Sequence, residues 1–137
     1  MSSIRVVLAG VLAGVVTLFI WIGFSFLTGP IYAMSPELWK PVGDLWFFGL
    51  ILLNILIGLV YALVYTILGK SMKGSVLDKG LLYGCLLWFI GPLPSILFAH
   101  LTINIPPEVI VSWIFSYLIN TLVAGIIIVF VYEEIKR

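Results

Sequence analysis

His100, the only histidine, is the residue best suited to acid–base chemistry, and Glu37 and Glu108 are carboxylates that could act with it. An imidazole paired with a carboxylate can transfer protons, so one hypothesis is a membrane enzyme whose site lies around His100. A metal site commonly takes three or four side-chain ligands, and a bis-histidine haem takes two histidines. We therefore expect no metal and no cofactor, and the sequence favours a protein that is not an enzyme.

A second set of residues resembles part of a phosphate-binding motif. Gly69, Lys70 and Ser71 match its end, but the motif also needs a glycine at position 64, where this chain has valine. We therefore interpret the segment as a basic turn. Its cations are expected to contact the anionic headgroups of lipids, and they are Lys70, Lys73 and Lys79.

Uncharged polar side chains form a third set, in the middle of long apolar segments. Pro92 and Pro94 cannot donate to the carbonyls of Trp88 and Ile90, which need other donors in hydrocarbon. Polar groups at similar depth could supply them, which predicts a site made of Thr17, Asn54, Pro92, Ser95, Ser116 and Asn120. Such groups either join helices by hydrogen bonds or bind a small solute or ion, and both roles stay open.

The surroundings of these residues are strongly apolar. Of the 137 residues, 63% are hydrophobic and only 9% are charged, and the mean hydropathy is +1.26. A soluble fold of this size exposes much of its surface and could not bury so many apolar side chains. The sequence therefore predicts an integral membrane protein. Its formal net charge of +1 argues against a nucleic-acid partner.

Four segments reach the length of about 20 apolar residues that a transmembrane helix needs. They cover residues 4–27, 45–68, 81–101 and 109–132. Because the runs are continuously apolar, they predict helices rather than the strands of a barrel. The expected fold is all-α, with one membrane domain over residues 1–137. It is a transmembrane four-helix bundle whose third helix is kinked at Pro92 and Pro94.

The distribution of basic residues orients these helices. With four crossings, Lys40 is the only one of the seven Lys and Arg residues that lies opposite the others. The positive-inside rule then places a basic loop, 69–80, and both termini in the cytoplasm, in a multi-pass protein of the cell (inner) membrane. The opposite side carries an outer loop, 28–44, with a short interfacial helix, and the outer-interface residues His100 and Glu108.

Small residues recur every four positions on the predicted helices, which is typical of close packing in lipid. The expected packing positions are Gly10, Gly14, Gly58, Ala62, Gly80, Gly84 and Ala124. They also indicate an internal repeat of two tandem hairpins. The offset is 70 residues from Gly10 to Gly80. It is 66 residues from Asn54 to Asn120 and from Gly58 to Ala124.

Three functions are compatible with these features. The preferred hypothesis is a non-enzymatic protein that acts by helix–helix association, as a homo-oligomer or as an accessory subunit of a membrane complex. The second is a channel or facilitator for a small neutral solute or an ion, with the polar residues at the middle of the bilayer as its site. The third is the enzyme around His100. The expected partners are the lipid bilayer and, under the first hypothesis, another membrane subunit.

Overall fold

The computed structural model describes residues 3–34, 36–38 and 43–134, and these ranges contain helices and short connections. The elements are α1 (Ser3–Ala33), the 3-10 helix η1 (Pro36–Leu38), α2 (Asp44–Leu68), α3 (Val76–Ile90), α4 (Pro92–Thr102) and α5 (Pro107–Glu134). α1, α2 and α5 are each long and apolar enough to cross a membrane, and so is the run that α3 and α4 form together. The prediction of an all-α chain with four such helices is confirmed.

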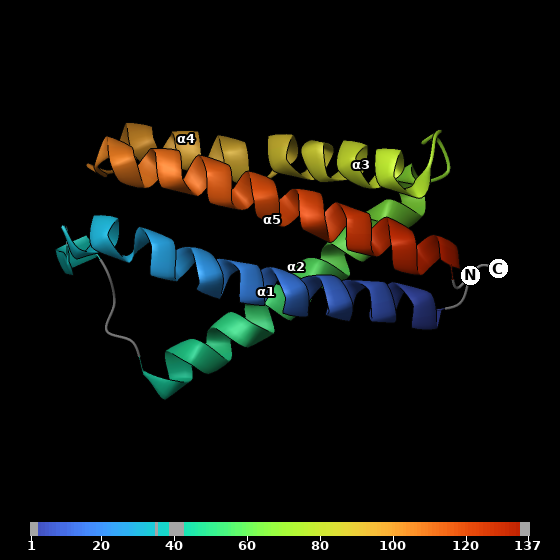
Figure 1. Cartoon of the computed structure of the whole chain (residues 1–137), viewed down its shortest axis with the longest axis horizontal. Coiled ribbons are helices and arrows are strands. Elements are labelled where there is room, and N and C mark those ends of the chain that lie inside the picture. The colour runs from blue at the N-terminus through green and yellow to red at the C-terminus, as the bar shows by residue number, and fades with distance from the viewer. Residues whose placement is uncertain (1–2, 35, 39–42, 135–137) are drawn as a thin grey trace.

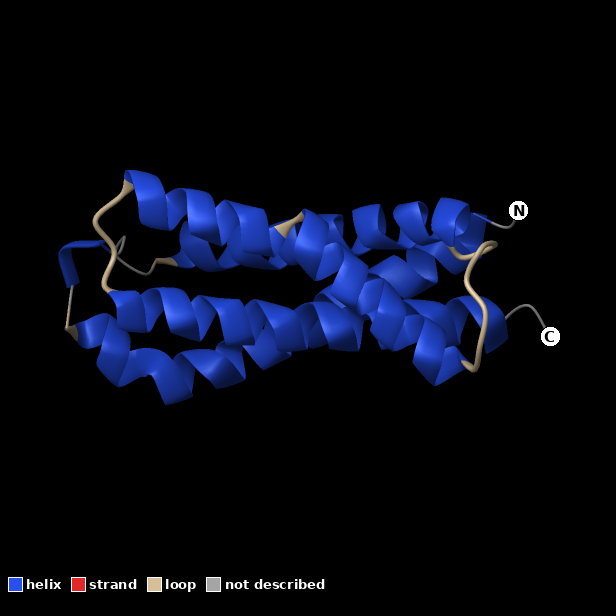
Figure 2. Ribbon diagram, turned by 90° about the horizontal axis from the view of Figure 1, so that it is seen from above, coloured by secondary structure: helices blue, strands red, loops and turns tan. Residues whose placement is uncertain are grey.

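The helices are arranged as two pairs, α1 with α2 and the α3–α4 run with α5. α1 begins and α5 ends at the same end of the bundle, and α3 and α4 follow one another along α5 (Figure 1). α2 crosses α1 obliquely, and its first half points away from α4 and α5 (Figure 1). The view from above shows the four long segments running along the same axis (Figure 2). The pairs meet mainly where α1 packs along α5.

α1 continues beyond the predicted end at residue 27 and reaches Ala33, with Pro30 inside the helix. Pro30 has no N–H to donate, but few residues follow it, so little of the helix is affected. Ile31 and Tyr32 pack against a buried cluster formed by Ile96, Ile105, Val109 and Ile110. We attribute the longer helix to this packing. In the outer loop, the expected interfacial helix corresponds to η1, and Lys40 lies outside the described residues.

α3 begins at Val76, five residues before the predicted start, because a capping box holds its first turn. The Ser75 hydroxyl accepts a hydrogen bond from the Asp78 N–H at 3.2 Å, and the Asp78 carboxylate accepts one from the Ser75 N–H at 3.1 Å. Gly74 precedes the cap with φ of 116°, a conformation that glycine adopts without strain. Lys79, expected in the loop, therefore lies on the helix.

Gly91 separates α3 from α4. Its N–H donates to the Leu87 carbonyl oxygen at 3.0 Å, and its own carbonyl oxygen accepts from the Ser95 hydroxyl at 3.0 Å. Pro92 and Pro94 lie in the first turn of α4, where a missing N–H removes no helical hydrogen bond. The prolines therefore begin a helix here.

Three glycines let the backbones of α1 and α2 touch. A Cβ on Gly10 would lie 2.6 Å from the Leu59 Cα, and a Cβ on Gly14 would lie 2.6 Å from the Asn54 carbonyl oxygen. On the facing helix, a Cβ on Gly58 would lie 2.7 Å from the Gly14 nitrogen. Side chains cannot be accommodated at such distances from backbone. We call this contact the first glycine seam.

α3 and α5 form a second glycine seam with nearly the same distances. A Cβ on Gly80 would lie 2.6 Å from the Ile126 Cα, and a Cβ on Gly84 would lie 2.6 Å from the Thr121 carbonyl oxygen. On α5, a Cβ on Gly125 would lie 2.7 Å from the Gly84 nitrogen. The two pairs of helices therefore use one packing arrangement twice.

The matching seams define the register of the internal repeat. The first helices of the pairs correspond at the predicted offset of 70 residues. In the second helices, Gly58 corresponds to Gly125, an offset of 67 rather than 66. The sequence match was wrong by one residue because it aligned Asn54 with Asn120 by residue type. The structural counterpart of Asn54 is Thr121.

The main buried core lies at the end of the bundle where α1 and α3 begin. Tyr65 and Tyr83 are its largest fully buried side chains, and their ring centroids lie 5.1 Å apart in an edge-to-face arrangement. The Tyr83 hydroxyl donates to the Tyr61 carbonyl oxygen and so joins α3 to α2. Ala62 and Ala124 are also buried in this core. The outer faces of the helices expose large apolar side chains, as is expected of helices apolar enough to cross a membrane.

Replacing Gly58 or Gly125 by alanine should destabilise the fold by about 1–3 kcal/mol, the usual cost of overpacking. Each added Cβ would meet the backbone of the facing helix. Gly49 in α2 is the matched control, because a Cβ there meets nothing within 4 Å. Gly49→Ala should leave the free energy of unfolding unchanged or raise it slightly. Steric-trapping measurements test this, and equal stability of all three variants would contradict the seams.

Candidate functional site

A cavity of about 120 Å³ lies near the middle of the bundle, where α1, α2 and α5 come together. We call it the central cavity. Its polar lining residues are Thr17, Asn54, Tyr61, Tyr117, Asn120 and Thr121. Its apolar lining residues are Trp21, Leu50, Leu53 and Ile57. The lining therefore offers hydrogen-bonding groups without a formal charge.

Asn120 has unused hydrogen-bonding capacity at this cavity. The residue is only 8% exposed, and its Oδ1 has no hydrogen-bond partner within residues 3–34, 36–38 and 43–134. Leaving a buried carbonyl oxygen unpaired costs about 1–3 kcal/mol, so such groups are uncommon in folded proteins. Asn120 also lines the central cavity, and an unpaired buried acceptor on such a residue makes the cavity a candidate ligand site.

The neighbouring polar side chains direct donors away from the cavity and toward their own helices. The Thr17 hydroxyl donates to the Ala13 carbonyl oxygen at 2.8 Å. An amide N–H of Asn54 donates to the Leu50 carbonyl oxygen at 2.9 Å, and the Thr121 hydroxyl donates to a carbonyl oxygen of its own helix at 3.0 Å. The oxygens of these side chains remain as acceptors. The Asn120 amide and the Tyr61 and Tyr117 hydroxyls add donors, so the lining of the central cavity offers both donors and acceptors to a ligand.

The central cavity lies where the two repeats meet. At the offset of 67 residues, three pairs of equivalent positions line it together: Leu50 with Tyr117, Leu53 with Asn120, and Asn54 with Thr121. Both members of each pair belong to the second helix of their hairpin, α2 or α5. Sites near the midplane at the interface of structural repeats are common in membrane transporters.

Of the residues predicted to form the polar site, Thr17, Asn54 and Asn120 line the central cavity. We expected the Asn54 and Asn120 carboxamides to contact the carbonyls that Pro92 and Pro94 leave without a helical donor. The structure does not show this contact. The Asn54 amide bonds within its own helix, and the Asn120 carbonyl oxygen has no partner in the described part of the chain. Because the first half of α2 leans away from α4, Asn54 lies on the α1 side of α2.

The other predicted members lie elsewhere. Pro92 and Ser95 line a second cavity of about 380 Å³ between α2, α4 and α5. The Ser116 hydroxyl is buried and donates to the Trp113 carbonyl oxygen of its own helix at 3.2 Å. The second cavity adjoins the central one, because both are lined by Ile57, Tyr61 and Tyr117.

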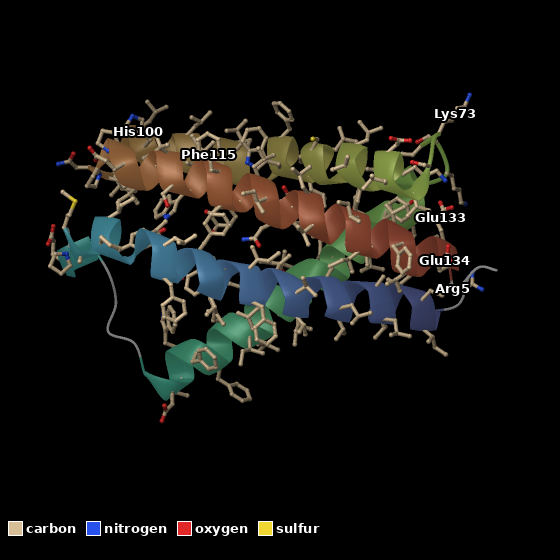
Figure 3. All side chains as sticks on the ribbon, viewed as in Figure 1. Arg5, Lys73, His100, Phe115, Glu133 and Glu134 are labelled. Atoms are coloured by element: carbon tan, nitrogen blue, oxygen red, sulfur yellow. The ribbon has the colours of Figure 1, made fainter. Side chains whose placement is uncertain are left out.

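The two residues expected at the outer interface are exposed and lie on different helices. His100 is in the last turn of α4 (Figure 3), and Glu108 is in the first turn of α5. Glu108 lines a mainly apolar cavity of about 490 Å³ between the C-terminal end of α1 and the N-terminal end of α5. Over the described ranges, no three His, Cys, Asp or Glu side chains are grouped so that they could hold a metal.

The three basic residues expected at lipid headgroups have different surroundings. The Lys79 ammonium group lies 2.8 Å from the Glu133 carboxylate. Lys70 lines a cavity at the end of the bundle together with Arg5. Lys73 is exposed in the turn between α2 and α3.

Sequence reasoning missed Trp21, Tyr61, Tyr117 and Thr121 as lining residues. Helical spacing could have found those on α5, because Tyr117, Asn120 and Thr121 are separated by three and four positions and share one face. The same spacing could have found Tyr61, which stands seven residues after Asn54 on the same face of α2.

The chain gives no significant match to any protein-family model, to any curated protein or to any solved structure. A functional interpretation therefore rests on the residues and geometry of this chain. Among the features described, the central cavity combines residues from three helices, several polar groups and a residue with an unpaired acceptor.

Replacing Asn120 by leucine, which has a similar volume, should leave the free energy of unfolding unchanged or raise it by about 1 kcal/mol. The reason is that an unpaired buried acceptor is removed. Tyr83→Phe is the contrasting control, because it deletes a buried hydrogen bond to the Tyr61 carbonyl oxygen and should cost about 0.5–1.5 kcal/mol. If Asn120→Leu destabilises the protein more than Tyr83→Phe does, the carboxamide has a structural role and the interpretation of the cavity is wrong.

Proposed function

We propose that this protein is a channel or facilitator for a small uncharged solute, and that the central cavity is its binding site. The observation that carries the proposal is the unpaired buried Oδ1 of Asn120, a residue that lines the central cavity. A solute with an N–H or O–H group would satisfy this acceptor once the carboxamide turns it toward the cavity.

The size and charge of the cavity define the class of solute. A volume of about 120 Å³ corresponds to about four water molecules, so it suits a solute of about four to six non-hydrogen atoms. The lining contains no acidic or basic side chain that could compensate a bare ion in this environment. Small amides and polyols meet both conditions and carry hydrogen-bond donors.

Association with another chain, the preferred hypothesis from the sequence, has less support. Its main argument was the set of small-residue stripes, and the glycines of these stripes meet within one chain in the two seams. They therefore supply no contact surface for a second copy or for another subunit. Catalysis around His100 also has less support, because the structure does not bring His100 and Glu108 into one described cavity.

We further propose an orientation in the cell (inner) membrane with both termini in the cytoplasm. The end where α1 begins and α5 ends carries Arg5, Lys70, Lys73 and Lys79, which the positive-inside rule assigns to that side. The break at Gly91 would be the kink of the third span. This break would leave space for the second cavity beside Pro92. The passage between the two cavities would be formed by Tyr61 and Tyr117, which line both.

Purified protein in liposomes should speed the entry of acetamide, urea or glycerol over protein-free vesicles, as measured by stopped-flow light scattering. The double variant Asn54→Leu/Asn120→Leu should lower this rate about tenfold or more, because two polar groups of the site are lost. Asn104→Leu is the control: it makes the same chemical change at an exposed position after α4 and should leave the rate unchanged.

Two results would contradict the proposal. One is entry no faster than in empty vesicles for all three solutes. The other is an equal rate of solute entry for the wild type and for the double variant, provided that the variant keeps its thermal unfolding midpoint. Flux would then not depend on the central cavity.

A further inference from the structure

Two basic side chains share a cavity at the end of the bundle where α1 begins and α2 ends. The cavity has a volume of about 240 Å³, and Arg5 and Lys70 line it together with Thr66, Tyr132 and Glu133. Within the part of the chain that the structure describes, neither Arg5 nor Lys70 has a carboxylate at ion-pair distance. The cavity therefore contains two cationic groups that no described acid neutralises.

Glu133, the one acid in the lining, is already engaged by other groups. Its Oε1 accepts a hydrogen bond from the Lys79 ammonium group at 2.8 Å and one from the Tyr65 hydroxyl at 3.3 Å. Lys79 belongs to α3 and is not part of the cavity lining. The positive charge of Lys79 thus balances Glu133, and the charges of Arg5 and Lys70 remain available to an anion.

We propose that this cavity binds the phosphate headgroup of an anionic phospholipid, with Arg5 and Lys70 as the binding residues. Arginine presents a planar set of N–H donors that matches phosphate oxygens, and lysine adds a mobile point charge. The proposal narrows the expected headgroup contacts of Lys70, Lys73 and Lys79 to Lys70 and adds Arg5, because Lys73 and Lys79 do not line the cavity.

The apolar surface around the cavity favours a lipid over free phosphate. Ile4, next to Arg5, is 68% exposed, and Ile67, close to Lys70, is 74% exposed. Both lie at the ends of helices that are long and apolar enough to cross a membrane. Acyl chains below a bound headgroup would cover these side chains, whereas inorganic phosphate makes no use of them.

Native mass spectrometry of the detergent-purified protein tests the site with two probes, dioleoyl phosphatidylglycerol and dioleoyl phosphatidylcholine. The wild type should retain the anionic lipid in preference to the zwitterionic one. Arg5→Gln and Lys70→Gln should each lower that preference about fivefold, the effect expected for one charge near a membrane surface. Arg5→Lys and Lys70→Arg keep the charge and should retain most of the preference.

Lys73→Gln is the matched control, because it removes the same charge from the same turn. Lys73 is exposed and lies away from Arg5 (Figure 3), so this variant should bind phosphatidylglycerol as the wild type does. Equal losses for Lys73→Gln and Lys70→Gln would overturn the proposal, because general surface charge would then explain binding. The lipid assignment would also fail if inorganic phosphate raised the thermal unfolding midpoint as much as phosphatidylglycerol.

Discussion

The structure depends on two places where helix backbones touch with no side chain between them. Lipid does not drive apolar helices together as water does, so membrane helices are held by close van der Waals contact and by hydrogen bonds. Glycine allows the closest approach, and each seam places two glycines of one helix against one glycine of the other. A side chain in either seam would push α1 away from α2 or α3 away from α5, because it would meet the backbone of the facing helix.

The seams also determine where the polar groups of the central cavity lie. The Asn54 carbonyl oxygen is one of the atoms closest to Gly14 in the first seam, and the Thr121 carbonyl oxygen plays the same part for Gly84 in the second. The side chains of both residues line the cavity. Two polar groups are thus anchored through backbones that cannot shift without breaking the packing. Such support from the scaffold is what a binding site needs to keep its geometry.

The sequence predicted the four spans well because their signal is strong and local. Long uncharged apolar runs have one common solution in a bilayer, which is a helix. The small residues also identified the seams, apart from the shift of one position between Ala124 and Gly125. That shift changes which residue faces the partner helix, and spacing within a single helix cannot reveal it. The end of α1 was missed for a similar reason. Ile31 and Tyr32, which follow Pro30, pack against residues far along the chain, and the sequence of α1 alone does not reveal that contact.

The members of the central cavity were harder to predict because they depend on how α2 crosses α1. Thr17, Asn54 and Asn120 were identified by depth alone, and depth does not say to which side of α2 a residue points. Pro92 and Ser95, expected at the same depth, line the second cavity, between α2, α4 and α5. Tyr61 and Tyr117, which line both cavities, could be placed only once the relative positions of α2, α4 and α5 were known.

The repeat has one further consequence, which arises from the way its two copies differ. At two of the three paired positions in the central cavity, α2 contributes a leucine where α5 contributes a polar residue, Tyr117 or Asn120. The central cavity is thus mainly apolar along α2 and polar along α5, although the scaffold around it is nearly symmetric. Under the proposed function, a solute with one polar edge and one apolar edge would bind in a single orientation.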